Sequence, residues 1–100
     1  MFLDDVLAVK RREVDALRLH PRAVPALAHS GFAQALRVPG LSVIAEIKRR
    51  SPSRGPLSPG LDAAGTARAY AEGGASAISC LTDSEFFGAL PDDLTQARTA

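Results

Sequence analysis

The 100-residue chain has no tryptophan, a single cysteine and few aromatic residues, and its formal net charge is only +1. Because Cys80 is the one cysteine, no internal disulfide bond can form, which favours a reducing compartment. The near-balanced charge argues against nucleic acid as a partner, since binding to phosphates needs an excess of basic residues. The early acids Asp4 and Asp5 and the lack of a long apolar run exclude an ordinary signal peptide and a membrane span. These absences predict a soluble, cytoplasmic protein.

What is present is typical of one small folded domain. Hydrophobic residues make up 46% of the chain and charged residues 23%, with both signs mixed. His20 and His29 lack the spacing of metal ligands and are expected at the surface, while Cys80 is expected to be a small core residue. No cluster of side chains indicates a metal site, and no glycine pattern indicates a dinucleotide cofactor.

Periodicity and breaker residues predict an alternation of helices and short strands. The expected elements are helices over residues 2–19 and 32–37, a strand over 41–47, an irregular loop over 49–60, a helix from Asp62 to the stop at Gly73, a strand over 75–81, and a helix from Asp92. Both strands are near-continuous apolar runs, which are typical of strands buried on both faces of a parallel sheet. A strand, a helix and a strand in this order predict two parallel strands joined by a right-handed crossover.

The first strand carries an unusual pair of charges. Strand alternation places Glu46 and Lys48 on the same face as Ile44, roughly 6.6 Å apart along the strand. Their attraction is about 2.5 kcal/mol at an effective dielectric constant of about 20. Desolvation of two deeply buried ions would cost more than this attraction returns. We therefore expect the pair at the open carboxyl end of the strand, where parallel α/β folds bind ligands. The alternative is a solvated strand end without a role.

The segment that follows is basic and rich in hydroxyl groups. Residues 48–55 hold four positive charges, two serines and no acid, a pattern that resembles a pocket for phosphate or carboxylate. A charged surface loop is the alternative, and the absence of interleaved aromatic residues argues against nucleic acid. Phe86 and Phe87 follow the second strand, where they would either cap a ligand pocket or pack beneath the next helix.

These residues match a known family in order and spacing. The run Val43–Gly55, with its Glu-x-Lys-x-x-Ser-Pro-Ser pattern, resembles the signature of indole-3-glycerol-phosphate synthase. The resemblance covers essentially the whole chain, because three further blocks also fit: residues 3–14, residues 74–83, and the stretch with Phe86-Phe87-Gly88 and Asp93-Leu94. It implies an α/β fold, the N-terminal part of a (β/α)₈ TIM barrel with an extra leading helix and two parallel strands. Residues 1–40 would form the leading helical segment, and residues 41–100 the first two β/α units.

The resemblance also implies an activity. The family consists of carbon–carbon lyases of tryptophan biosynthesis that work without a cofactor. They convert 1-(2-carboxyphenylamino)-1-deoxyribulose 5-phosphate to indole-3-glycerol phosphate, carbon dioxide and water. By this resemblance, Lys48 would act in acid–base chemistry and contact the anionic, phosphorylated substrate, with Glu46 as its partner. Ser51 and Pro52 would line the substrate site, and Phe87 would be its apolar wall. No metal and no membrane partner is implied.

Two departures from the family pattern shape the expectation. Residues 89–91, Ala-Leu-Pro, stand where the family usually has a Gly-Ser pair. A barrel takes about 250 residues, so the chain holds two of eight strands and lacks the family's second catalytic lysine, which comes from the third. The chain is thus expected to be inactive alone, with the missing C-terminal barrel segment or a second copy as its partner. The alternatives are a non-catalytic half-barrel remnant that acts as a folding or interaction module, and a phosphate-binding module of another barrel family.

Overall fold

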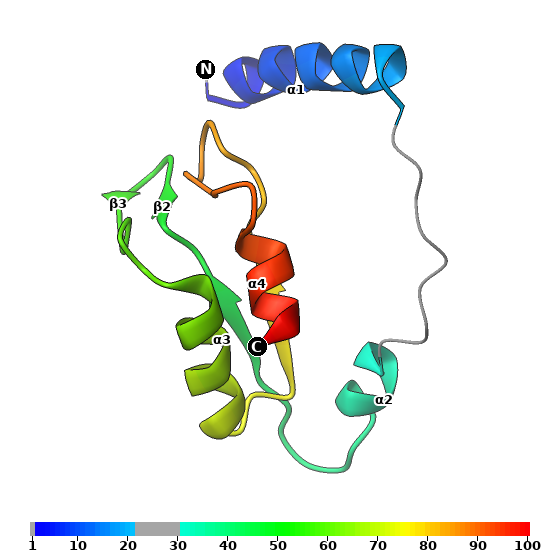
Figure 1. The fold of residues 1–100 in the computed structure, drawn as a ribbon, viewed down its shortest axis with the longest axis vertical. Coiled ribbons are helices and arrows are strands. Elements are labelled where there is room, and N and C mark those ends of the chain that lie inside the picture. Colours follow the sequence, from blue (N-terminus) through cyan, green and yellow to red (C-terminus); the bar gives the residue numbers. More distant parts are fainter. Residues whose placement is uncertain (1, 22–30) are drawn as a thin grey trace. The chain divides into compact units, whose positions relative to one another are not determined.

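The computed structural model describes residues 2–21 and 31–100, which belong to two units, residues 1–30 and 31–100. The first unit contributes one long helix, and the second contains the sheet and the other helices (Figure 1). In chain order the elements are α1 (Phe2–Leu19), α2 (Phe32–Leu36), β1 (Ile44–Ile47), β2 (Arg50–Ser51), β3 (Gly55–Pro56), α3 (Ala63–Glu72), β4 (Ala77–Cys80) and α4 (Asp93–Thr99).

The helix α1 has the bounds that the sequence predicts. Acidic residues lie in its first turn and Arg18 in its last turn, which complements the helix dipole. Lys10 Nζ lies 2.9 Å from Glu13 Oε2, one turn further along. His20 is exposed, as predicted, whereas His29 lies outside the described residues. No helix within residues 2–21 and 31–100 is long and apolar enough to cross a membrane.

In the second unit, β1 and β4 pair in parallel and α3 is the crossover between them, which confirms the predicted α/β fold with two parallel strands. The register pairs Ile44 with Ala77 and Ile47 with Cys80. The helix α3 and the helix α4 contact each other and the sheet (Figure 1). Because the strands are parallel, their carboxyl ends meet at one edge of the sheet, where the loops after β1 and β4 begin.

The sequence sets both ends of α3. The Asp62 side chain accepts a hydrogen bond from the Gly65 backbone N–H at 3.1 Å, which caps the amino terminus. The helix ends at the predicted glycine pair, where Gly74 has a φ of 99° that glycine adopts without steric cost. The crossover helix α3 therefore begins and ends at residues whose local chemistry stops it there.

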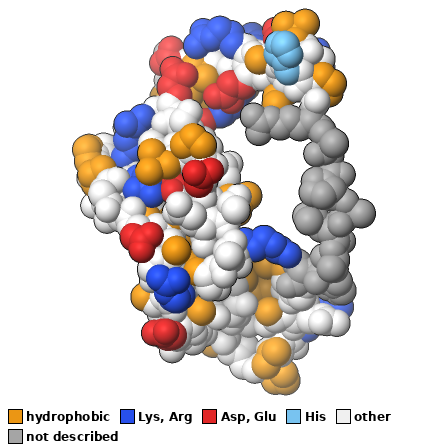
Figure 2. All heavy atoms as spheres, viewed as in Figure 1, with side chains coloured by type: hydrophobic (Ala, Val, Ile, Leu, Met, Phe, Trp, Pro, Cys, Tyr) orange, Lys and Arg blue, Asp and Glu red, His pale blue; other side chains and the backbone are white. Residues whose placement is uncertain are grey.

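Burial along β1 differs from the prediction of a strand covered on both faces. The strand begins at Ile44 rather than at residue 41, and Val43 and Ile44 are 50% and 51% exposed. Ala45 and Ile47 point to the face of the sheet that α3 and α4 cover. Among the described residues, no helix contacts β1 from the opposite face, on which Ile44 lies. Cys80 is likewise only partly buried and is not the core residue predicted, although burial raises the pKa of its thiol. Figure 2 shows hydrophobic side chains at the surface alongside charges of both signs.

The small core gives a stability prediction with a matched control. Ile47 is 2% exposed, so Ile47→Ala should lower the free energy of unfolding by about 2–5 kcal/mol. Ile44→Ala should cost only about 1 kcal/mol, since half of that side chain is already in water. A strand buried on both faces, as the sequence predicts, would instead give a loss of about 2–5 kcal/mol at Ile44 in a completed barrel, where that position would be core. Urea titrations of both variants provide the measurement, and equal losses would contradict the assignment of the two faces.

The loop after β1 contains a small hairpin that the sequence did not predict. The strands β2 and β3 are antiparallel and pair Arg50 with Pro56 and Ser51 with Gly55. The backbone N–H groups of residues 57 and 58 donate to the Arg49 carbonyl at 2.9 and 2.8 Å, which closes the base of the hairpin. This hairpin therefore carries the Ser-Pro-Ser turn beside the strand end.

Candidate active site

Three of the predicted site residues meet at the carboxyl ends of the parallel strands. Lys48 Nζ lies 2.8 Å from Glu46 Oε1. The same nitrogen lies 5.7 Å from the centroid of the Phe87 ring, in the loop after β4, a distance typical of a cation–π contact. The side chains of Lys48 and Glu46 are 31% and 43% exposed, so the pair is open to water or to a ligand. This agrees with the desolvation argument that placed the pair at a strand end.

A fourth residue, Ser79, belongs to this group and was missed by the sequence analysis. The parallel register places Ser79 opposite Glu46, and its hydroxyl donates to Glu46 Oε2 at 3.1 Å. Each carboxylate oxygen of Glu46 therefore has its own donor. A signal was present in the sequence, because Ser79 is one of two hydroxyl residues, with Ser76, in the mainly apolar strand predicted over residues 75–81.

The surroundings keep Glu46 ionised. The hydrogen bond from Lys48 holds the pKa of the Glu46 carboxyl below its usual range, partial burial opposes this shift, and the Ser79 hydrogen bond lowers the pKa further. Tyr70 reaches the same residue from α3, where its hydroxyl donates to the Glu46 backbone carbonyl at 3.3 Å. An ionised carboxylate can accept a proton, and the adjacent ammonium can bind an anion or donate a proton.

Ser51 is the last residue of β2, and Pro52 begins the hairpin turn. The Ser51 hydroxyl accepts a hydrogen bond from the Arg54 backbone N–H at 3.2 Å and lies 3.5 Å from the Ser53 hydroxyl, while Pro52 is exposed. Within residues 31–100, no hydrogen bond joins either residue to Glu46 or Lys48. The two residues predicted to line the site therefore lie in the adjoining hairpin and do not take part in the Glu46–Lys48 contact.

The interpretation of residues 48–55 as a group of four available cations is wrong for Arg49. Its guanidinium is buried and forms two hydrogen bonds with the Asp93 carboxylate, Nε to Oδ2 at 2.9 Å and Nη2 to Oδ1 at 2.7 Å. Its Nη1 donates to the Pro59 and Leu61 carbonyls, each at 2.8 Å. The Arg49 hydrogen bonds hold the pKa of Asp93 below its usual range against the opposing effect of burial. Arg49 joins the loop after β1 to α4 and is not available to a ligand.

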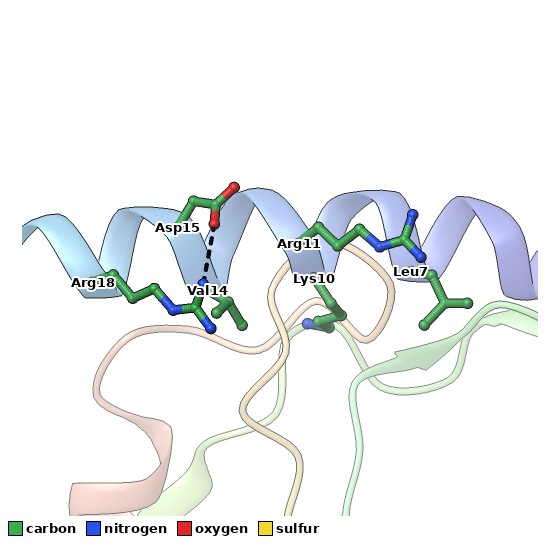
Figure 3. Close-up of a pocket in the computed structure, with 6 residues that line it drawn as sticks. All are labelled: Leu7, Lys10, Arg11, Val14, Asp15 and Arg18. Carbon is green, nitrogen blue, oxygen red and sulfur yellow. Dashed lines mark ion pairs between the residues drawn. The ribbon is translucent and has the colours of Figure 1, made fainter.

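The rest of residues 2–21 and 31–100 offers no second candidate site. The described part of the chain contains no group of three or more histidine, cysteine, aspartate or glutamate side chains placed to hold a metal ion. A hollow runs along α1 (Figure 3), with an ion pair of 4.0 Å between Asp15 and Arg18. Its lining residues are Leu7, Lys10, Arg11, Val14, Asp15 and Arg18. All belong to α1 and none is a predicted site residue, so the candidate site remains at the strand ends.

Known proteins resemble this chain along most of its length. The indole-3-glycerol phosphate synthase of Syntrophobacter fumaroxidans is 43% identical over 109 aligned residues, which cover 99% of this chain and 41% of that protein. Indole-3-glycerol phosphate synthase 2 of Streptomyces coelicolor is 51% identical over 90 residues, covering 90% and 34%. The corresponding protein of Opitutus terrae is 44% identical over 107 residues, covering 97% and 40%. The chain therefore spans about two fifths or less of the length of these curated relatives.

A model of the indole-3-glycerol phosphate synthase family matches residues 3–100. The match includes both parallel strands, the crossover helix and the loops that hold Lys48 and Phe87. Because it extends over nearly all of the sequence, the chain belongs to the indole-3-glycerol phosphate synthase family.

Proposed function

We propose that this chain supplies the Glu46–Lys48 part of an indole-3-glycerol phosphate synthase active site. The observation that carries the proposal is the 2.8 Å contact between Lys48 Nζ and Glu46 Oε1 at the carboxyl ends of two parallel strands, beside the Phe87 ring. In barrels of parallel strands this edge is where catalytic side chains lie. The names of the relatives point to the same reaction.

The reaction defines what the pair has to do. Ring closure forms a carbon–carbon bond at the carbonyl carbon of the substrate, breaks the bond to the carboxylate, and releases the carbonyl oxygen as water after it gains two protons. In our proposal Lys48 binds an anionic group of the substrate and donates a proton, and the ionised Glu46 accepts one. Phe87 provides an apolar wall for the aromatic ring, and Ser51 and Pro52 line the site from the hairpin.

The test is the appearance of indole fluorescence when substrate is added. This chain has no tryptophan, so its indole signal would come from the product, and for the fusion the signal is the increase that depends on added substrate. Two proteins are compared: this chain alone, and a fusion in which it replaces the segment that it matches in the Streptomyces coelicolor relative. We expect the fusion to form product. A folded fusion without turnover would refute the proposal, and circular dichroism separates that result from misfolding.

The chain alone tests the expectation that a partner is needed. Product from this chain by itself would mean that it assembles a working site, for example by self-association. A second candidate function, a non-catalytic interaction module, is favoured by Ile44, which is half-exposed on the open face of β1, and by the half-exposed Val43 just before the strand. Sedimentation of the chain at several concentrations, together with the product assay, separates the two functions. Association without turnover in the chain and in the fusion would support the module.

The Ser79 hydroxyl leads to a prediction about pH dependence. Ser79→Ala removes one of the two donors that lower the pKa of Glu46, so that pKa should rise. At a given acidic pH, a larger fraction of Glu46 is then protonated, and the acid limb of the pH–rate profile of the fusion should move to higher pH. Ser79→Thr retains the hydroxyl and is the matched control. An acid limb that stays in place in Ser79→Ala would contradict the role of Ser79.

A further inference from the structure

Arg50 forms hydrogen bonds with the loop after β4, which contains Phe87. Its Nη2 donates to two successive backbone carbonyls of this loop, Ser84 O at 3.1 Å and Glu85 O at 2.6 Å. Its own backbone N–H donates to the Phe87 carbonyl at 3.3 Å. The main chain and the side chain of one residue in β2 therefore both hold the loop that follows β4.

The aliphatic part of Arg50 also packs on this loop. A Cβ atom at Gly88 would lie 3.2–3.3 Å from Arg50 Cγ, Cδ and Nε, so the side chain lies directly against the glycine backbone. Gly88 has a φ of 68°, which permits this close approach. The Gly88 N–H donates to Ser84 O at 2.9 Å, and Asp83 Oδ2 accepts from the Phe86 N–H at 2.7 Å. The loop is thus a closed turn, and Arg50 attaches it to the hairpin.

We propose that Arg50 is a positioning residue for Phe87 and that it fixes this ring at the Lys48 ammonium, where the aromatic part of the substrate would bind. The inference rests on the proposed function, since Phe87 is the proposed apolar wall. A substrate-binding group contributes to binding only when it is held in its productive position, so a residue that fixes the loop has a functional consequence. Arginine suits this role because its planar, multi-donor guanidinium reaches both carbonyls, whereas a lysine ammonium lacks this geometry.

The first measurement does not depend on activity. Hydrogen exchange of the backbone amides of residues 86–89 is followed by NMR in the wild-type full chain and in Arg50→Ala. We expect exchange of these amides to become about tenfold faster in the variant, because the loop loses two charge-assisted hydrogen bonds. The Gly73 amide at the end of α3 should exchange at the wild-type rate, since it bonds to Ala69 O, whereas the bonds of Arg50 go to the loop after β4.

Two further variants make the comparison specific. Arg54 lies in the turn of the same hairpin, and its guanidinium bonds to none of the described residues. In Arg54→Ala, exchange of the amides of residues 86–89 should therefore stay unchanged. Arg50→Lys should restore protection only in part. Unchanged exchange in Arg50→Ala, or equal acceleration in Arg54→Ala, would overturn the proposal.

The second measurement is steady-state kinetics in the fusion with the Streptomyces relative. Arg50→Ala should raise KM about three- to tenfold while kcat changes little, because the ring wall is displaced but the Glu46–Lys48 pair remains. An unchanged KM with faster exchange would overturn the positioning role of Arg50. If the wild-type fusion shows no turnover, the proposed function fails, while the exchange comparison still decides whether Arg50 holds the loop.

Discussion

Replacement of Lys48 by alanine in the fusion is expected to lower turnover by about 10²- to 10⁴-fold, the usual contribution of a positioned acid–base group. Two effects act together in this variant. The substrate loses a cationic partner, and Glu46 loses the hydrogen bond that contributes most to its lowered pKa. Stability should change little, because Lys48 is 31% exposed and its contacts lie at a strand end open to solvent. Indole fluorescence gives the rate, and urea unfolding gives the stability.

Two comparisons decide how Lys48 acts. Lys48→Arg keeps the positive charge but has no accessible neutral form, so it should retain more substrate binding than Lys48→Ala while its kcat remains low. Arg68→Ala removes an exposed cation from α3 outside the site and should behave like the wild type. Near-normal turnover in Lys48→Ala would refute the catalytic assignment, whereas loss of folding in that variant would refute the placement at an open strand end.

Arg49→Ala is expected to lower the free energy of unfolding by about 3–5 kcal/mol, the usual cost of removing one partner from a buried ion pair. The side chains of Arg49 and Asp93 are 6% and 3% exposed, so solvent cannot replace the missing partner. The carbonyls of Pro59 and Leu61 would lose their shared donor as well. Replacement of both residues, Arg49→Met with Asp93→Leu, should be less damaging than Arg49→Ala, because no charge then remains buried.

The same pair makes stability depend on pH. Because the folded state holds the pKa of Asp93 below its unfolded value, the stabilisation is complete above the unfolded pKa and is lost as the pH falls through the folded one. Unfolding titrations from neutral to acidic pH should therefore show a steeper loss of stability in the wild type than in the double variant. Parallel losses in the two proteins would contradict a stabilising role for the Arg49–Asp93 pair.

Local chemistry explains which parts of the structure were predictable. The carboxyl end of α1 follows from Pro21, and the two ends of α3 follow from the capping Asp62 and from Gly73-Gly74, all of which act within one turn of the chain. The Glu46–Lys48 contact follows from strand alternation and from the cost of burying ions. The Arg49–Asp93 pair joins residues 44 positions apart, and no local pattern distinguishes Arg49 from the cations beside it. Likewise β2 and β3 have two residues each, too few for a periodic signal.

Burial was the least predictable property. Apolar runs indicated strands covered on both faces, yet coverage depends on which elements lie alongside, and the described helices leave the Ile44 face of β1 open. Ser79 is an intermediate case, because its contact with Glu46 follows once the parallel register is known. The sequence therefore predicts the order and type of the elements, whereas burial and the partners across strands depend on how those elements pack.

Lys48, Arg49 and Arg50 look interchangeable in composition, but the structure assigns them different partners: an open carboxylate, a buried carboxylate and two loop carbonyls. Permuting their order would leave length, composition and net charge untouched. In the order Arg-Lys-Arg, a lysine ammonium would stand at position 49, where the Arg49 guanidinium forms four hydrogen bonds. The order Arg-Arg-Lys would lose both the lysine at the strand end and the fork that holds the loop. The information in this basic triplet is therefore its order, and comparisons based on charge alone would not detect its loss.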